Sequence, residues 1–235
     1  MKKLTTLLLL FISITSFSQE ITGDELLDKA IQFHDPNGNW ATFNGELFVT
    51  MEIPEKSPRK SALKINLPQE YFSVKAIRDT ITTEYTVDKA VASFIFNGDN
   101  KPSEAIKKKF NLNAERANMY KNYYTYLFGL PMKLKDKGTI IDQKITKKTF
   151  KGKEYLVLKA TYSAEVGKDT WYFYFDPTTY AMEVYQFFKE TKDSGEYILL
   201  SDLETINGVK MPKTRAWYYN KDNGYLGTDT LSSQK

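Results

Sequence analysis

The single histidine of this 235-residue chain, His34, is followed directly by Asp35, and a histidine beside a carboxylate could serve as a general base with its orienting group. The pair could also supply half of a metal site, but a zinc site commonly uses three or four protein ligands. Because the chain has no cysteine and no second histidine, every other ligand would have to be a carboxylate. We therefore expect a structural His34, its imidazole bonded to a backbone carbonyl at a helix end, and keep a hydrolase built on this pair as a third hypothesis.

Carboxylates can also act in pairs, as the two acidic residues of a glycosidase do. The candidates lie around the aromatic segment 169–188 and are Asp169, Asp176, Glu183 and Glu190. Asp176 precedes Pro177 in an expected turn, and the other three fit solvent-facing positions of strands. The sequence contains no Gly-x-Ser-x-Gly motif, phosphate-binding loop or dinucleotide fingerprint. The residues therefore predict a protein that is not an enzyme and that has no catalytic residue, metal or cofactor.

The aromatic side chains could instead bind an apolar molecule. Segment 169–188 reads DTWYFYFDPTTYAMEVYQFF, two strand-like stretches around a turn. Alternate side chains of a strand share a face, so Trp171, Phe173 and Phe175 should point together toward the interior. Tyr172 and Tyr174 should present their hydroxyls outward from the other face. An ordinary core explains this pattern without a ligand, and a ligand cavity remains the alternative.

The first residues predict export. Lys2 and Lys3 precede an apolar run over residues 7–12 and small polar residues ending at Ser18, which is the pattern of a cleavable signal peptide. The apolar run is shorter than the roughly 20 residues that a membrane span needs. With no cysteine to carry a lipid anchor, residues 19–235 are expected to form a single soluble domain in the periplasm.

Cleavage after Ser18 would lower the net charge from +4 to +2, with 31 basic and 29 acidic side chains remaining. The densest basic runs, 107–109 and 144–148, lack the one-sided excess that a phosphate-binding surface requires. This balance predicts that nucleic acid is not a partner.

Short strands and turns dominate the rest of the chain. Thr22 and Glu25 have the spacing of a capping box before a short amphipathic helix. From Trp40 onward the apolar period is two, and the turns between successive strands are too short for crossover helices. The Asn207-Gly208 pair is a strong signal for a tight hairpin. About ten or eleven antiparallel strands are expected.

One helix interrupts these strands. Asn113 can cap a helix that ends at Gly129, with Pro131 just beyond it. Its second half, residues 120–128, is aromatic on more than one side, whereas a helix lying flat on a sheet needs only one apolar stripe. The pattern favours insertion into a concave surface, and a well-buried core helix with tyrosine hydroxyls at its rim is the alternative.

Several stretches carry a family resemblance. They are Phe33 to Trp40 (FHDPNGNW), Phe128 to Met132 (FGLPM), Tyr174 to Pro177 (YFDP) with Tyr180, Gly195 to Ile198 (GEYI) and Asn207 to Pro212 (NGVKMP). With these stretches the chain resembles the LolA-like superfamily of lipoprotein carriers and lipoprotein-sorting proteins. It resembles more closely a family of uncharacterised exported proteins of Bacteroidetes-type bacteria.

The resemblance implies an α+β fold of mostly antiparallel strands, a curved incomplete barrel of about ten strands with two main helices covering its concave face. It also implies an apolar cavity between sheet and helices that binds a lipid or another hydrophobic molecule, in a carrier or a sensor. A docking module for another envelope protein, without a ligand, is the alternative. The superfamily's carriers have a cavity arginine that contacts the lid, and no arginine here lies in a matching sequence context: Arg59, Arg78, Arg116 and Arg215.

These expectations select eight residues for the ligand site. Six should line the cavity, namely Trp40, Met51, Tyr123, Leu127, Trp171 and Phe173. Tyr120 and Tyr124 should lie at its mouth.

Overall fold

A computed structural model describes residues 20–191 and 193–233 of the chain, so the predicted signal peptide lies outside the described residues. Thirteen strands form one antiparallel sheet in the order β5-β4-β3-β2-β1-β13-β12-β11-β10-β9-β8-β6, and β7 also pairs with β8. The strands are β1 (Asn44–Ile53), β2 (Lys56–Asn66), β3 (Tyr71–Arg78), β4 (Ile81–Asp88), β5 (Val91–Phe96), β6 (Thr139–Ile141), β7 (Thr146–Phe150), β8 (Lys153–Tyr162), β9 (Thr170–Phe175), β10 (Met182–Phe188), β11 (Glu196–Ile206), β12 (Val209–Tyr219) and β13 (Tyr225–Ser232).

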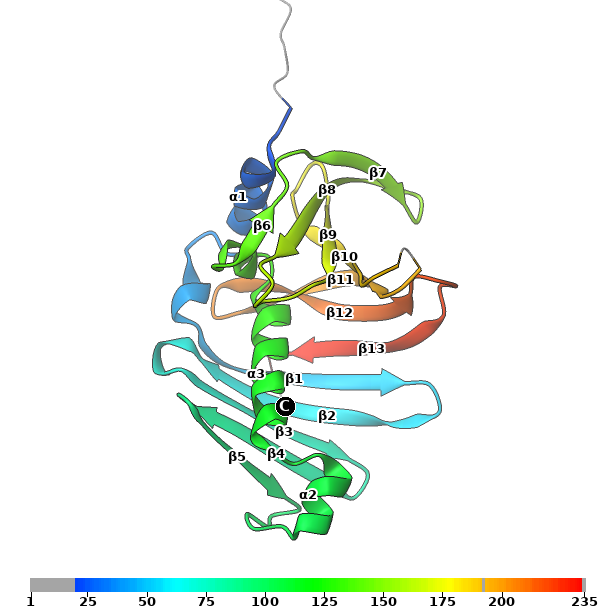
Figure 1. The fold of residues 1–235 in the computed structure, drawn as a ribbon. Helices are drawn as coiled ribbons and strands as arrows, with labels where there is room; N and C mark the ends of the chain where they lie inside the picture. The colour runs from blue at the N-terminus through cyan, green and yellow to red at the C-terminus, as the bar shows by residue number, and fades with distance from the viewer. Residues whose placement is uncertain (1–19, 192, 234–235) are drawn as a thin grey trace, which may run out of the picture.

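The first and the last strand pair in the middle of this sheet. From β1 the chain runs outward, one strand at a time, to β5 at one edge, and it returns from β6 at the other edge to β13 beside β1. The connection from β5 to β6 must therefore cross the whole sheet. It contains helices α2 (Glu104–Phe110) and α3 (Ala114–Gly129), and α3 lies across the strands (Figure 1).

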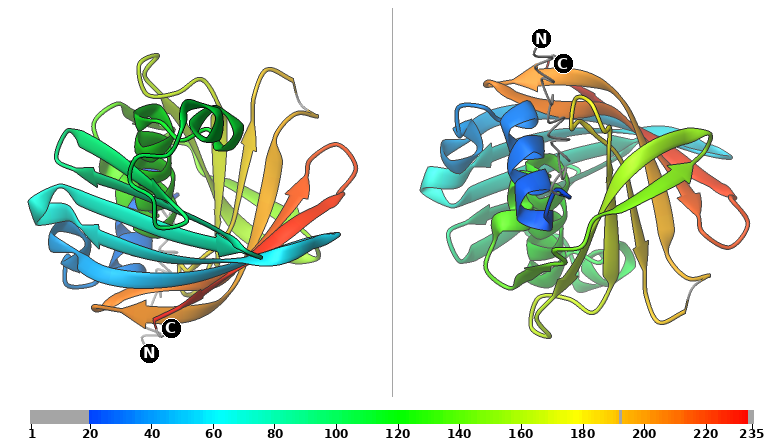
Figure 2. Two further views of the ribbon diagram at one scale, coloured as in Figure 1. Left: turned by 90° about the horizontal axis from the view of Figure 1, so that it is seen from below. Right: turned by 90° about the horizontal axis from the view of Figure 1, so that it is seen from above.

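The sheet curves strongly, and the helices lie inside the curve (Figure 2). Register shifts occur in β1 between Met51 and Ile53, in β10 after Met182, and in β12 after Trp217. Such irregularities bend a strand and increase its twist. The result is an open half-barrel whose concave face is covered by α3 and by α1 (Gly23–His34), as the sequence predicts.

Helix α3 contacts two separate apolar clusters on that face. Tyr124 and Phe128 pack into the cluster over β1 to β5, whereas Leu127 packs into the cluster over β8 to β11 and under α1. A helix with sheet on both sides needs apolar side chains on both sides, which explains its aromatic content.

Local signals in the sequence define the helix ends and one hairpin. Thr22 and Glu25 form the predicted capping box of α1, and the Asn113 side chain accepts a hydrogen bond from the Arg116 amide at 2.7 Å. Asn207 and Gly208 connect β11 and β12 with φ angles of 50° and 81°, which asparagine and glycine tolerate best.

Two expectations are wrong in detail. The sheet has thirteen strands rather than ten or eleven, because the short β6 and β7 both pair with β8. Tyr174 does not point its hydroxyl to solvent but is completely buried. The hairpin that contains β7 packs over it, with the Phe150 ring 5.2 Å away, and Gln186 and Lys148 bond its hydroxyl.

Gly129 provides a test of how closely the end of α3 packs. A Cβ atom at this position would lie 2.4 Å from the ring of the buried Trp40. Gly129→Ala should therefore lower the free energy of unfolding by about 1–3 kcal/mol, the usual cost of overpacking a core, in urea denaturation. Gly167→Ala is the matched control, since its Cβ would lie 3.9 Å from the nearest atom, and equal effects in the two variants would refute the packing.

Candidate ligand-binding site

A pocket of about 1150 Å³ opens beside α3 on the concave face. Its volume is slightly above the usual range of small-molecule sites, roughly 300–1,000 Å³. Four segments enclose it: the second half of α3, residues 133–139 beyond it, the loop 162–169 between β8 and β9, and the strands from β9 to β13 together with β1. The apolar residues among its lining are Met51, Ile53, Tyr123, Tyr126, Leu127, Tyr162, Val166, Trp171, Phe187, Trp217 and Leu226.

The register of the sheet builds the floor of this pocket. Met51 of β1 lies opposite Asp229 of β13, and two positions further on Gly227 lies opposite Trp217 of β12. At the far end, Glu196, Phe187 and Trp171 form another cross-strand row. Because alternate residues of a strand share a face, all of these point to the concave side.

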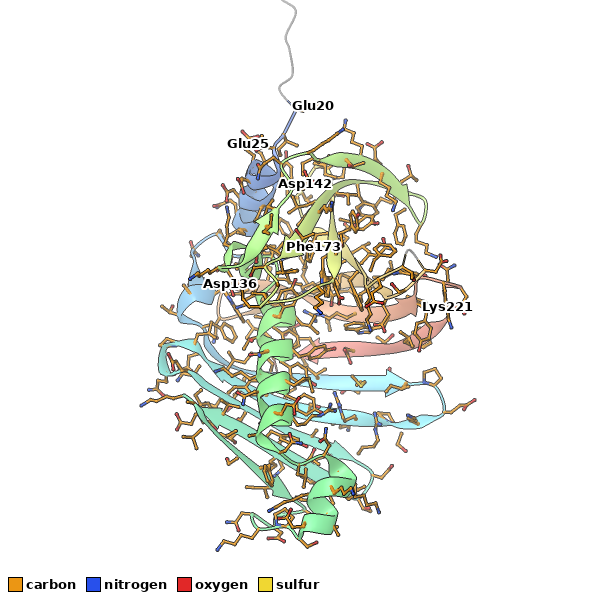
Figure 3. The ribbon with its side chains drawn as sticks, in the orientation of Figure 1. Glu20, Glu25, Asp136, Asp142, Phe173 and Lys221 are labelled. Carbon is orange, nitrogen blue, oxygen red and sulfur yellow. The ribbon has the colours of Figure 1, made fainter. Side chains whose placement is uncertain are left out.

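Aromatic rings line the far end, and charged side chains surround the opening. The Trp171 ring stacks on Phe187 at 4.8 Å and meets the Tyr126 ring edge-on at 5.7 Å. The Tyr126 and Tyr162 hydroxyls are hydrogen-bonded to each other, which joins α3 to the loop. The segments around the opening contribute charged residues to the lining, namely Lys133, Asp136, Lys137, Glu165, Lys168, Asp169 and Lys189. Asp136 lies beside the end of α3 (Figure 3).

A buried polar row runs under α3 at the near end of the floor. Arg59, Met51, Asp229 and Arg215 are successive cross-strand partners on β2, β1, β13 and β12. Two cations therefore flank one carboxylate on the concave face, in a region that the helix covers.

Arg215 fastens the end of α3 to the sheet. The carbonyl of Leu127 lacks a donor within the helix, because four residues later stands Pro131, which has no N–H. Arg215 is 1% exposed and donates from Nη2 to this carbonyl at 3.4 Å and from Nη1 to the Pro212 carbonyl at 2.8 Å. Its guanidinium also lies 4.5 Å from the centre of the Phe128 ring.

Arg59 holds the same helix from the other side. Its Nη2 donates to the Tyr124 hydroxyl at 2.9 Å. Burial raises the pKa of Tyr124 to about 12, and the positive charge of Arg59 offsets part of this effect. The tyrosine is therefore neutral at physiological pH and accepts the charged hydrogen bond.

Burial also raises the pKa of Asp229, and the charges of Arg215 and Arg59 counteract part of the shift. The only hydrogen bond to its side chain in the described structure comes from Trp217 Nε1 to Oδ2, at 3.2 Å. Burial holds the pKa of Tyr123 well above its usual range, and the nearby charge of Asp229 adds to this effect.

The structure brings four of the eight predicted residues together in this pocket: Met51, Tyr123, Leu127 and Trp171. The other four lie outside it. Trp40, Tyr120 and Tyr124 pack in the cluster over β1 to β5, and Phe173 is fully buried between the sheet and α1 (Figure 3).

Sequence reasoning missed the polar row. Arg215 was considered only as a possible match to a carrier arginine, although the period-two pattern of β12 places it in register with Val209, Met211 and Trp217 on the inward face. A charged residue at an inward position was the available signal. No local pattern indicates that Arg59, Arg215 and Asp229 lie close together, because this depends on the pairing of β1 with β13.

His34 has a structural role, as predicted. Its Nδ1 donates to the Lys210 carbonyl at 2.7 Å and its Nε2 accepts the Met182 amide at 3.0 Å, so the ring joins α1 to β12 and β10. Asp35 accepts the amides of Asn39 and Trp40, both at 2.8 Å. Both ring nitrogens are occupied, and the two side chains do not form a catalytic pair.

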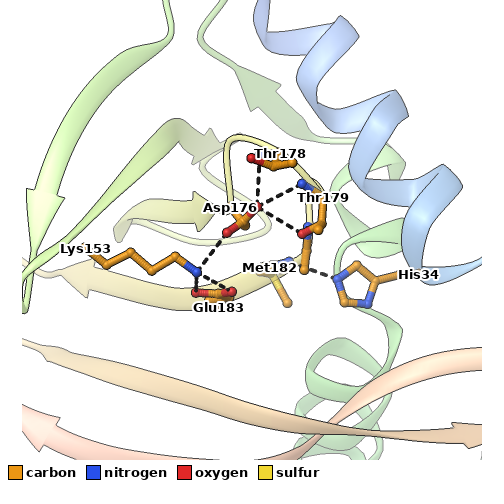
Figure 4. Close-up of polar contacts among 8 residues, drawn as sticks. His34, Lys153, Asp176, Thr178, Thr179, Met182 and Glu183 are labelled. Carbon is orange, nitrogen blue, oxygen red and sulfur yellow. Dashed lines mark hydrogen bonds and ion pairs between the residues drawn. The ribbon is translucent and has the colours of Figure 1, made fainter.

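Two of the four carboxylates around the aromatic hairpin, Asp176 and Glu183, are held by Lys153 (Figure 4). Lys153 bonds Asp176 and Glu183, each at 2.8 Å, and Asp176 also accepts the amides of Thr178 and Thr179. The hydrogen bond from Lys153, followed by those from the turn amides, lowers the pKa of Asp176. In residues 20–191 and 193–233, no three acidic or histidine side chains converge as metal ligands would.

Fold and site together define a class of protein: an open, curved antiparallel sheet with a helix laid across its concave face and a ligand-sized pocket beside the helix. The chain belongs to a family of unknown function, DUF6503, whose model matches residues 2–234. No curated protein matches the chain in sequence. No helix among the described residues is long and apolar enough to cross a membrane.

Several solved structures are similar to the chain. A LolA superfamily protein from Nitrosomonas europaea is 11% identical with a TM-score of 0.49, over 90% of this chain and 92% of that one. A domain described as an outer membrane lipoprotein-sorting protein, from Vibrio parahaemolyticus, is 10% identical with a TM-score of 0.49, over 89% and 90%. A DUF1329 family protein from Desulfovibrio piger is 8% identical with a TM-score of 0.48, over 89% and 91%.

The buried His34 predicts a specific dependence of stability on pH. Burial lowers its pKa from 6.5 to about 4, so between these values the unfolded chain binds a proton that the folded protein does not. Acidification from pH 7 to pH 4 should therefore cost about 3 kcal/mol at this group. His34→Gln should be less stable at pH 7 and lose that part of the pH dependence in urea denaturation, and an unchanged dependence would contradict the assignment.

Proposed function

We propose that the protein binds a lipid or another largely apolar molecule in the pocket beside α3, without enzymatic activity, as an exported carrier or sensor. The observation that carries this proposal is the pocket itself, with apolar side chains from five of the six neighbouring strands of its floor and its charged opening. An apolar floor with few polar groups is typical of small-molecule sites.

The area of the floor is sufficient for useful affinity. Burying one methylene contributes about 0.8 kcal/mol, so about ten of them contribute roughly 8 kcal/mol, which corresponds to a dissociation constant near 1 μM. The distance from Asp229 on β13 to Trp171 on β9 covers four strand spacings, or about 19 Å. One extended acyl chain lying across the strands fits this floor.

The absence of enzymatic activity is supported by how the ionisable groups are used. His34 and Asp35 bond backbone groups, and Asp176 and Glu183 pair with Lys153. Export to the periplasm is supported by the signal pattern of residues 1–18.

Docking onto another envelope protein is a second candidate, and β5 favours it. This edge strand, VASFIF, has no charged residue, and Val91 is 71% exposed. Uncharged edge strands are templates for pairing with another chain. The pocket is nevertheless the larger feature, and a docking module does not explain it.

Met51 allows a direct test of the pocket, since it is half-buried on the floor beside Arg59 and Asp229. Met51→Gln should fold, because glutamine matches methionine in length and adds no charge between Arg59 and Asp229, but its amide should weaken binding of the uncharged fluorescent probe N-phenyl-1-naphthylamine about tenfold. The measurement is a fluorescence titration of the purified protein.

Ile77→Gln is the matched control, because Ile77 is an exposed apolar residue of β3 outside the pocket. It should bind the probe like the wild-type protein. Equal affinity in all three proteins, with unchanged circular dichroism, would remove the pocket as the binding site.

A further inference from the structure

Unpartnered polar atoms concentrate at the near end of the pocket floor. In the part of the chain that the structure describes, six buried side-chain nitrogen or oxygen atoms lack a hydrogen-bond partner. Three of them belong to the polar row, on Arg59, Arg215 and Asp229. Folded proteins leave few such atoms, and a local group of them calls for a physical explanation.

Asp229 is the member of this group that lines the pocket. Its side chain is only 6% exposed, and its Oδ1 has no partner. Around it the floor and the helix are mostly apolar, with Met51 and Leu127 among the lining residues. A buried carboxylate oxygen without a donor costs free energy that a donor supplied by a ligand would recover.

The two arginines do not meet this need. No ion pair joins either of them to Asp229 in the described residues, and their hydrogen bonds go to Tyr124 and to the carbonyls of Leu127 and Pro212. Neither arginine is part of the pocket lining. A ligand in the pocket can therefore contact the Asp229 carboxylate directly, but neither arginine.

We propose that the ligand has a hydrogen-bond-donating polar end, a hydroxyl or an ammonium group, which binds the Asp229 carboxylate while the apolar chain extends over the floor toward Trp171. This inference rests on the proposed function and specifies its ligand as a neutral or cationic amphiphile. The Tyr123 hydroxyl, which burial and the Asp229 charge keep protonated, provides a second polar contact at the same end.

The arrangement discriminates against fatty acids. A ligand carboxylate at this position would place two like charges side by side in a buried site, where repulsion and desolvation are both unfavourable. A hydroxyl or an ammonium group has a proton to donate and avoids both effects. Asp229 is thus a specificity-determining residue for the polar end of the ligand.

The experiment compares three ligands of equal chain length, hexadecanol, hexadecylamine and hexadecanoate, as competitors of N-phenyl-1-naphthylamine. The wild-type protein should bind hexadecanol about tenfold more tightly than hexadecanoate. In Asp229→Asn this ratio should fall to about one, because the amide can accept from the alcohol and donate to the carboxylate. Tighter binding of hexadecylamine than of hexadecanol would support the proposal and indicate that the polar end of the ligand is an ammonium group. The reverse order would support the proposal and indicate a hydroxyl.

Asp202→Asn is the control, because Asp202 is an exposed residue of β11 outside the pocket, and it should keep the wild-type ratio. If Asp229→Asn does not fold, Asp229→Leu serves, and it should bring hexadecanol down to the affinity of hexadecanoate. If the wild-type protein prefers hexadecanoate, or if the ratio of the two affinities is unchanged in the Asp229 variants, this inference is overturned, whereas the pocket remains the binding site. Failure of the probe and all three ligands to bind the wild-type protein would overturn both proposals.

Discussion

The pairing of β1 with β13 is the constraint on which the rest of the structure depends. It places the first and the last strand in the middle of the sheet, so the two halves of the sheet extend outward from the centre and end at opposite edges. One segment must then connect those edges, and the shortest route that buries its apolar side chains lies across the concave face. Helix α3, the two clusters on either side of it and the pocket beside it all follow from that crossing.

The same pairing assembles the polar row. β2 is the neighbour of β1, and β12 is the neighbour of β13. Because β1 pairs with β13, Arg59 of β2 and Arg215 of β12 lie on either side of Asp229. Burying two cations is unfavourable unless each has hydrogen-bond acceptors. The Tyr124 hydroxyl and the free carbonyl of Leu127 supply these acceptors from α3. The helix is thereby fastened to the sheet at two points, and the pocket lies beside it.

Much of the fold could be predicted from the sequence because its signals are local. The capping box at Thr22, the helix from Asn113 to Gly129 and the hairpin at Asn207 each depend on residues within a few positions of one another. Short turns between period-two segments were sufficient to predict an antiparallel sheet. The packing of β7 over Tyr174 was not foreseen, because β7 carries a single apolar residue, Phe150, and contacts a residue far away in the sequence.

The site could be predicted only in part, for a physical reason. Aromatic content identifies apolar side chains but does not say whether another element fills the space above them. Leu26 and Leu27 of α1 pack over the end of the sheet where Phe173 lies, whereas Trp171 is only partly buried, beside Tyr126, and lines the pocket. The role of Asp229 depends on partners far away in the sequence, which no local pattern reveals.

Native mass spectrometry of the protein purified from the cells that produce it tests the central claim most directly. Ligand binding in the pocket predicts a complex heavier than the chain by the mass of an amphiphile, which organic extraction then releases for identification. A clean mass of the chain alone, together with no uptake after incubation with a total lipid extract from the same cells, would contradict it.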